Sequence, residues 1–469
     1  MKRPFALFNE AIHALFYPDS VAVIGASSIP GKIGHEILRS ISQHEYRGKV
    51  YAVNPKAAEI LGLKSYESIE AIPDRIDLAV LAIPAPAVPE AIEKCASKGA
   101  QAAVIVSGGF KELGGELEEI EKKIVRTARM HNIRIIGPNC IGIFNSSNRL
   151  DTFFQSHDRM RRPERGPVAF MTQSGTFGCT ILEWAAEANL GISKFISYGN
   201  RCDVDEADLI DYLAQDDDTK VIGVYVEGFG DGRKFMEAVR RVVAEKPVVV
   251  LKAGRSEKGS KVALSHTGWL AGSYEVCESA LKQCDALVVH DIAELFDVAK
   301  ALAKQPVANG RGIAMATNGI GPCVMAADRC VELGLDLPRL EDRTLLRLRR
   351  ELPSYCVVNN PVDLTGSGTS RDYMNALMAL AEDRSVDLLM PFFVFQDTPL
   401  GEEILDLLPS LKRYGKPILC CASGGEFTRK CSDALEWSGI PVYPTPERVV
   451  AAAKALVSRG EFLKGLEQN

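Results

Sequence analysis

Short apolar runs alternate with amphipathic stretches along the first third of the chain. The apolar runs are expected to form strands at residues 21–25, 49–53, 77–83, 102–106 and 134–136. Apolar positions at helical spacing fill the gaps between them, as at 86–97 and 116–131. Strands that alternate with helices predict a parallel, doubly wound sheet.

The same alternation returns twice more. Strands are expected at residues 167–171, 194–197, 221–226 and 247–251, and again at 312–316, 388–393 and 417–421. A polar stretch at 142–165 is interpreted as a crossover between domains, and the Pro- and Gly-containing stretch 304–311 as a linker. The pattern therefore predicts an α/β protein of three consecutive doubly wound domains, at 1–146, 147–305 and 306–469.

In such a sheet, ligands bind beyond the carboxyl ends of the strands. The strands of the first domain end in small residues or proline, which allow a ligand to approach the backbone: Gly25-Ala26-Ser27, Asn54-Pro55, Pro84, Ser107-Gly108 and Gly137-Pro138-Asn139. The first helix start can hold a phosphate, with Lys32 or Lys56 as a counter-charge. A phosphorylated adenine cofactor fits this ring of loops, and a purely structural glycine turn is the alternative.

A nicotinamide dinucleotide is disfavoured here. The glycines fall at Gly25, Gly31 and Gly34, which is not the G-x-G-x-x-G spacing. The second strand ends in Asn54-Pro55, where an acidic residue would hold the ribose.

Two helix starts in the later domains are predicted anion sites, because a helix N-terminus presents backbone N–H groups. In the second domain Gln173, Ser174 and Gly175 precede a helix, and the next strand ends in Gly199-Asn200. In the third domain a loop containing Gly319 and Gly321 opens another helix.

His266 stands in a Gly-, Ser- and Lys-rich stretch, 253–272, that is expected to be a long mobile loop. The stretch does not fit a nucleotide-binding P-loop, because Ser260-Lys261 follows Gly254 and Gly259 where a lysine followed by Ser or Thr is required. A surface loop that happens to carry a histidine is the remaining alternative. Glu227 follows a strand of the same sheet, so the two side chains can meet. A carboxylate beside an imidazole raises its basicity, which suggests phosphoryl transfer through a phosphohistidine.

Composition narrows the class of protein. The chain has 469 residues, a net charge of −6 and no apolar run near the length of a membrane span, which argues against nucleic-acid binding and membrane insertion. The first five residues lack a signal-peptide core, so a cytoplasmic location is expected. The 12 cysteines include no C-x-x-C pair, and no metal site is predicted.

Six motifs in a fixed order make the whole chain resemble the α subunit of ADP-forming (NDP-forming) acyl-CoA synthetases, relatives of succinyl-CoA synthetase. They are Val-Ile-Gly-Ala-Ser, Gly-Pro-Asn-Cys, Gln-Ser-Gly, Tyr-Val-Glu-Gly, Ser-His-Thr-Gly and Asn-Pro-Val-Asp-Leu-Thr-Gly. The resemblance implies a Rossmann-like coenzyme A-binding domain, a ligase domain with the phosphohistidine loop, and a carboxy-terminal flavodoxin-type domain.

The resemblance also assigns roles. His266 would carry the phosphoryl group and Glu227 would stabilise it. Coenzyme A would be bound by Gly25, Ala26, Ser27, Pro30, Lys32, Pro55, Lys56, Pro84, Ser107, Phe110 and Asn139. Phosphate would be bound by Gln173, Ser174, Gly175, Gly199, Asn200, Gly319 and Gly321.

The implied reaction interconverts acyl-CoA, phosphate and ADP with an organic acid, coenzyme A and ATP, through an acyl phosphate. No stretch of the chain is similar to the family's ATP-grasp module. We therefore expect a separate ATP-grasp β subunit that holds ADP or ATP and Mg²⁺, in a heterotetramer of two α and two β chains. Three departures from the family pattern are Trp269, Ser107-Gly108-Gly109-Phe110 and Thr317-Asn-Gly-Ile-Gly.

Two other hypotheses compete with this one. A non-catalytic coenzyme A-binding or sensing protein on the same fold would bind coenzyme A without becoming phosphorylated. An NAD-dependent dehydrogenase would bind nicotinamide in the first domain.

Overall fold

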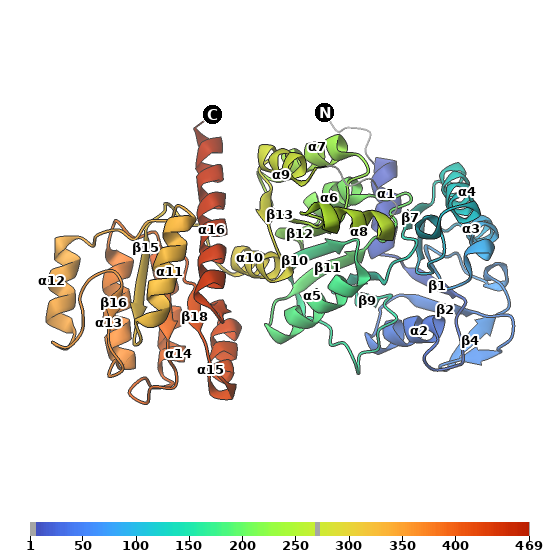
Figure 1. Cartoon of the computed structure of the whole chain (residues 1–469). Helices are drawn as coiled ribbons and strands as arrows, with labels where there is room; N and C mark the ends of the chain where they lie inside the picture. The colour runs from blue at the N-terminus through green and yellow to red at the C-terminus, as the bar shows by residue number, and fades with distance from the viewer. Residues whose placement is uncertain (1–5, 268–272, 469) are drawn as a thin grey trace. The chain divides into compact units, whose positions relative to one another are not determined.

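The computed structural model describes the backbone of residues 6–267 and 273–468, and side chains over 10–262 and 273–468. The chain divides into two compact units, Met1–His290 and Asp291–Asn469. The first unit holds two sheets and the second unit holds one (Figure 1). No helix in the described part of the chain is long and apolar enough to cross a membrane.

The first sheet has the order β3-β4-β2-β1-β5-β6-β7, and its β1, β2, β5, β6 and β7 are parallel. Its strands are β1 (Ser20–Ile24), β2 (Lys49–Val53), β3 (Glu59–Ile60), β4 (Leu63–Tyr66), β5 (Leu78–Leu81), β6 (Ala102–Ile105) and β7 (Arg134–Ile136). Its helices are α1 (Ala6–Phe16), α2 (Ile33–Gln43), η1 (Ile69–Ala71), η2 (Ala85–Ala87), α3 (Val88–Ser97), η3 (Lys111–Leu113) and α4 (Glu116–Met130). Strand order reverses between β1 and β5, and such a switch point opens a crevice for a ligand.

The second sheet has the order β14-β13-β12-β10-β11-β8-β9. Its strands are β8 (Gly142–Asn145), β9 (Leu150–Asp151), β10 (Arg165–Thr172), β11 (Ile192–Ser197), β12 (Val221–Val226), β13 (Val248–Lys252) and β14 (Leu287–Val289). Its helices are α5 (Gly175–Glu187), α6 (Glu206–Ala214), α7 (Gly232–Val242), α8 (Glu257–Thr267) and α9 (Tyr274–Gln283). The switch point here lies between β10 and β12.

Two expectations about this sheet need correction. The stretch 142–165 is more than a crossover, because β8 pairs antiparallel with β11 and β9 pairs with β8 at the sheet edge. The stretch 253–272 is not one long loop, because most of it forms helix α8. The Ser256 hydroxyl accepts a hydrogen bond from the Gly259 N–H at 3.1 Å, as an N-terminal cap does, and the Gly- and Ser-rich composition hid that start.

The second unit repeats the flavodoxin-like order, β16-β15-β17-β18-β19, with all neighbours parallel. Its strands are β15 (Ile313–Thr317), β16 (Val362–Asp363), β17 (Leu388–Phe393), β18 (Cys420–Ala422) and β19 (Val442–Tyr443). Its helices are α10 (Ile292–Lys304), α11 (Gly321–Glu332), α12 (Asp342–Glu351), α13 (Ser370–Glu382), α14 (Ile404–Leu407), η4 (Leu408–Tyr414), α15 (Glu426–Trp437) and α16 (Pro446–Glu467).

Alternation along β15 explains why helices cover both faces of this sheet. Ile313 and Met315 belong to the apolar cluster that includes α10, α11 and α16, whereas Ala314 and Ala316 belong to the cluster that includes α12 and α13. Both clusters are fully apolar, which is typical of a parallel sheet buried on two sides. Helix α10, at residues 292–304, belongs to this unit although its residues fall within the second predicted domain.

Candidate active site

The loop after β1 is held tightly against the loop after β5. Gly25 has φ +88°, and a Cβ there would lie 2.4 Å from the Ala82 carbonyl oxygen. A Cβ on Gly34, at the start of α2, would lie 2.0 Å from the Gly25 carbonyl oxygen. Glycine at both positions therefore lets helix α2 approach the sheet closely and leaves the crevice at the switch point open.

This crevice is a pocket of about 260 Å³. Of the residues predicted to bind coenzyme A, the pocket is lined by Gly25 and Pro55. Sequence reasoning missed other lining residues, including Glu67, Ser68, Ile83, Glu90 and Lys94. They come from η1, α3 and the loops beside them, whose positions depend on how the strands are ordered.

The other predicted coenzyme A residues lie in different surroundings. Ser27, Pro30, Lys32, Lys56 and Pro84 are exposed or half-buried around the strand ends, and Ala26 is buried. Phe110 is fully buried in the apolar core of the first domain, and its ring lines neither this pocket nor the larger cavity described below.

A larger cavity of about 670 Å³ lies where the first sheet meets the second, within the first unit. It brings together predicted residues from both domains: Ser107, Asn139, Gln173, Ser174, Gly175, Gly199 and Asn200. Its lining also includes residues that sequence reasoning missed, namely Ile33, Val106, Phe154, Gln155, Thr176, Cys179 and Thr180. Thr176, Cys179 and Thr180 could have been found from their spacing on α5, because residues four apart share a helix face.

The start of α5 is locked in place by short-range hydrogen bonds. The Thr172 hydroxyl donates to the Ser174 carbonyl oxygen and accepts from the Ser174 N–H, at 2.9 and 3.0 Å. The Ser174 hydroxyl caps the helix by accepting from the Phe177 N–H at 3.4 Å. The first turn of a helix presents N–H groups that no carbonyl within the helix can satisfy, so this end of the cavity attracts an anion.

Gln173 connects the start of α5 to Glu227 across the switch point. Its side-chain oxygen accepts from the N–H groups of Glu227 and Gly228, at 2.5 and 3.3 Å. Gln173 is buried, so its side-chain amide holds the loop after β12 in place.

Glu227 is 9% exposed, and its carboxylate accepts a hydrogen bond from the Tyr225 hydroxyl at 3.3 Å. The ammonium of buried Lys252 donates to the Glu227 carbonyl oxygen at 2.8 Å, and burial lowers the pKa of that ammonium. The backbone of His266 lies in α8, and its side chain lies outside the described residues, as does Trp269. The pairing of Glu227 with His266 therefore stays a prediction.

Asn200 joins the two domains behind the cavity. Its side-chain N–H groups donate to the carboxylates of Glu112 and Glu121 at 2.6 and 3.1 Å, and its side-chain oxygen accepts from Asn139 at 3.4 Å. Burial raises the pKa of the Glu121 carboxyl. The side-chain N–H groups of Asn200 are thus both hydrogen-bonded to carboxylates, one from η3 and one from α4. Sequence reasoning did not anticipate these two contacts.

The predicted anion site of the second unit has the same local construction as the start of α5. The Thr317 hydroxyl donates to the Gly319 carbonyl oxygen and accepts from the Gly319 N–H, at 2.8 and 2.9 Å. A Cβ on Gly319 would lie 2.8 Å from Val394, while Gly321 at the start of α11 faces open space. Both glycines therefore sit at the switch point between β15 and β17.

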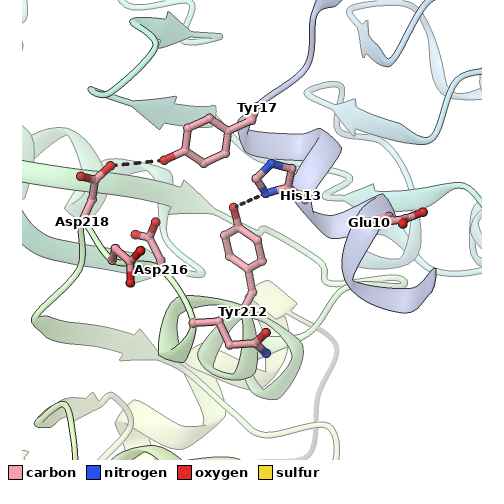
Figure 2. A pocket seen from close by; sticks show the side chains of 8 residues that line it. Glu10, His13, Tyr17, Tyr212, Asp216 and Asp218 are labelled. Carbon is pink, nitrogen blue, oxygen red and sulfur yellow. Dashed lines mark hydrogen bonds between the residues drawn. The ribbon is translucent and has the colours of Figure 1, made fainter. Parts of the chain in front are cut away.

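A further pocket, of about 520 Å³, lies between α1 and α6 (Figure 2). The rings of His13 and Tyr17 stack at 4.8 Å, and the Tyr212 hydroxyl shares a hydrogen bond of 3.3 Å with His13. Two of its four acidic residues form ion pairs within the protein: Lys194 donates to Asp216 at 2.6 Å and Arg165 donates to Asp218 at 2.5 Å. We therefore interpret this pocket as part of the packing between α1 and α6.

Comparison with known proteins matches two domain families. Residues 19–146 match the CoA binding domain, and residues 165–302 match the succinyl-CoA ligase like flavodoxin domain. The acetate–CoA ligase [ADP-forming] II subunit alpha of Pyrococcus furiosus is 40% identical over 96% of this chain and 98% of its own.

Two further relatives extend the comparison. Acetate–CoA ligase [ADP-forming] I of Archaeoglobus fulgidus is 41% identical over 94% of this chain, which spans only 63% of that longer protein. The solved dinucleotide forming acetyl-coenzyme A synthetase 1 of Ca. Korarchaeum cryptofilum, in complex with phosphate and ADP, superposes with a TM-score of 0.89 at 34% identity, over 97% of this chain and 98% of its own.

Proposed function

Because the chain belongs to the family of α subunits of ADP-forming acetate–CoA ligases, which are acid–thiol ligases, we propose that it interconverts acyl-CoA, phosphate and ADP with an organic acid, coenzyme A and ATP. The observation that carries this proposal is the 670 Å³ cavity. Its lining includes both Ser107 and Asn139 of the coenzyme A-binding domain and the helix start at Gln173–Gly175. A thioester and a phosphate can therefore meet in one cavity.

In the first step a phosphate oxygen attacks the thioester carbonyl carbon. A carbon–oxygen bond forms, the carbon–sulfur bond breaks, and coenzyme A leaves as the thiolate. The N–H groups at the start of α5 hold the phosphate and favour its negative charge. The cavity wall holds the acyl carbonyl beside it, which lowers the entropic part of the barrier.

In the second step an imidazole nitrogen of His266 attacks the phosphorus of the acyl phosphate. A nitrogen–phosphorus bond forms, the bond between phosphorus and the acyl oxygen breaks, and the organic acid leaves as its carboxylate. Glu227 stabilises the positive charge that develops on the imidazole. Helix α8 then presents the phosphohistidine to the nucleotide, and an oxygen of the ADP β-phosphate takes the phosphoryl group.

We further propose that the nucleotide and Mg²⁺ are held by an ATP-grasp β subunit, in a heterotetramer of two α and two β chains in the cytoplasm. The alpha designation of the Pyrococcus relative supports a partner subunit. The Archaeoglobus relative supports the same arrangement, because this chain leaves more than a third of that longer protein uncovered.

The test is to incubate the complex with an acyl-CoA and labelled phosphate in the absence of ADP, and to map the label. We expect one acid-labile phosphoryl group on His266. His266→Ala should remove it, whereas His131→Ala, at the exposed end of α4, should not. Coenzyme A binding without any label would contradict the proposal and favour a non-catalytic coenzyme A-sensing protein.

A further inference from the structure

We infer that Lys252 is a positioning residue for phosphoryl transfer, and that it holds Glu227 in place relative to the segment that carries His266. This inference rests on the proposed function and adds to it a residue that acts through Glu227. It starts from a buried ammonium group that neither step of the proposed reaction uses. Lys252 is 1% exposed although it is the last residue of β13, at the edge of the sheet where ligands bind.

The Lys252 ammonium joins the ends of two neighbouring strands. It donates to the Glu227 carbonyl oxygen at 2.8 Å and to the Ala253 carbonyl oxygen at 2.5 Å. Glu227 directly follows β12, Ala253 directly follows β13, and these two strands pair in parallel. From Ala253 the chain leads into α8, whose backbone includes His266. One nitrogen atom therefore ties the loop that carries Glu227 to the start of the segment that carries His266.

The loop after β12 is held at four backbone groups by buried side chains. The Gln173 side-chain oxygen accepts from the N–H groups of Glu227 and Gly228, and the Arg201 guanidinium donates to the Gly228 carbonyl oxygen. Lys252 supplies the fourth contact, to the Glu227 carbonyl oxygen. Gln173, Arg201 and Lys252 are all buried, so the position of the Glu227 backbone is closely fixed.

The start of α8 is connected to the same anchor. Gly254, directly after Ala253, has φ +77°, and its carbonyl oxygen accepts from the Ser260 hydroxyl at 2.7 Å. A Cβ on Gly254 would lie 3.3 Å from the Ser260 Cα, so the turn packs closely against the helix. The hydrogen bond from Lys252 to Ala253 is therefore passed on through this turn to α8.

The two cations of the loop differ in how their charge is balanced. Arg201 donates to both carboxylate oxygens of Glu206 at 2.9 and 3.1 Å, and both side chains are buried. The two acceptors of Lys252 are neutral carbonyls. Burial lowers the pKa of the Lys252 ammonium, and the Cys277 thiol and the Glu227 carboxylate, which face it, partly oppose this shift.

A buried ammonium costs free energy that a hydrocarbon side chain of the same length would not. Phosphoryl transfer to His266 gives this charge a use. The phosphoryl group brings negative charge toward the Glu227 carboxylate, and the interior screens charge weakly. An ammonium fixed behind Glu227 reduces that repulsion while it holds the loop.

Lys252→Met tests the inference, because it keeps the length of the side chain and removes the ammonium. In the complex, rapid-quench labelling with acyl-CoA and labelled phosphate measures transfer to His266. Acyl-CoA cleavage with arsenate measures the first step alone, because an acyl arsenate hydrolyses in water without His266. We expect Lys252→Met to slow labelling by about 10- to 100-fold and to leave cleavage with arsenate unchanged.

Lys194→Met is the matched control. Lys194 is a fully buried lysine of the same sheet, on β11, and its ammonium donates to Asp216 at 2.6 Å. This variant should lower stability, because it leaves the Asp216 carboxylate without that partner, and it should keep the ratio of the two rates. Equal falls of labelling and of cleavage with arsenate in Lys252→Met would assign Lys252 a structural role and overturn the inference.

A double-mutant cycle shows whether Lys252 acts through Glu227. In a Glu227→Gln background, Lys252→Met should slow labelling by less than about 3-fold, because the carboxylate that it positions is already gone. The full effect of Lys252→Met in both backgrounds would overturn the inference and leave the proposed function standing. A wild-type complex that cleaves acyl-CoA with arsenate and never labels His266 would instead defeat the proposed function, and the role of Lys252 with it.

Discussion

At the scale of single residues, the arrangement around Glu227 gives the sharpest prediction. Its backbone N–H is held by Gln173, and its carboxylate is held beside Tyr225 in a nearly closed environment. A carboxylate fixed in this way can stabilise an imidazolium far better than one in water, since the interior screens charge weakly.

We therefore expect Glu227→Gln to slow formation of the phosphohistidine by about 10²- to 10⁴-fold, because the amide keeps the shape and removes the charge. Rapid-quench labelling with acyl-CoA and phosphate measures the rate, and calorimetry with coenzyme A measures binding, which should not change. Glu237→Gln, at an exposed position of α7, is the matched control. A labelling rate within about threefold of wild type in Glu227→Gln would exclude this role.

Residues at the carboxyl ends of strands could be predicted from the sequence, because a parallel sheet brings those ends to one edge. Ser107, Asn139, Gln173 and Gly175 do line a common cavity. Phe154 could not be predicted, because its place depends on the antiparallel edge strands before it. The use of the Asn200 amide by Glu112 and Glu121 could not be predicted either, because it is a contact between domains.

At the scale of elements, the turn from β1 into α2 offers a comparison between two glycines. Gly25 and Gly31 both have positive φ, of +88° and +82°. A Cβ on Gly25 would lie 2.4 Å from the Ala82 carbonyl oxygen, whereas a Cβ on Gly31 would meet no atom within 4 Å. An alanine would therefore have a strained backbone at either position, but only at Gly25 would its methyl group also clash with a neighbouring atom.

We expect Gly31→Ala to cost about 1–2 kcal/mol of stability from the positive φ alone. Gly25→Ala should cost about 1–3 kcal/mol more, because the added methyl displaces the loop after β5, and it should weaken coenzyme A binding by about 10-fold or more. Urea unfolding followed by intrinsic tryptophan fluorescence measures the loss of stability, and calorimetry with coenzyme A measures binding. If both variants bind coenzyme A equally well, the crevice at Gly25 is not where coenzyme A binds.

The sequence also predicted most elements, since the apolar runs of parallel strands and the amphipathic helices between them are strong local signals. It missed α8, because Gly259 and two serines are weak helix formers and Ser256 is recognisable as a cap only once the hydrogen bond to Gly259 is seen. The stretch predicted to be the phosphohistidine loop therefore contains a helix, α8, that packs against η3 of the first domain. Any movement of His266 toward a nucleotide must therefore release or carry α8.

At the scale of the whole molecule, the chain is organised as two units whose sheets repeat one topology. In the second and third sheets, strands β10 and β15 are each followed by a turn that a threonine hydroxyl closes, at Thr172 and Thr317, and then by a helix that begins at Gly175 or Gly321. These repeated helix starts can hold phosphate. The pocket at Gly25 belongs to the domain that matches coenzyme A-binding proteins.

If the partner subunit holds the nucleotide, phosphorylation of the α chain and transfer of its phosphoryl group to ADP should depend on the partner differently. The α chain, once phosphorylated on His266, should keep its phosphoryl group for at least tens of minutes with ADP and Mg²⁺ alone, and should lose it within seconds when the β subunit is added. Only the second mixture should release ATP. Loss of label and ATP release are measured on the isolated phosphorylated chain, and phosphate hydrolysis without ADP gives the background rate. ATP formation by the α chain alone would mean that this chain binds the nucleotide itself, and would place the ADP site at one of the helix starts described above.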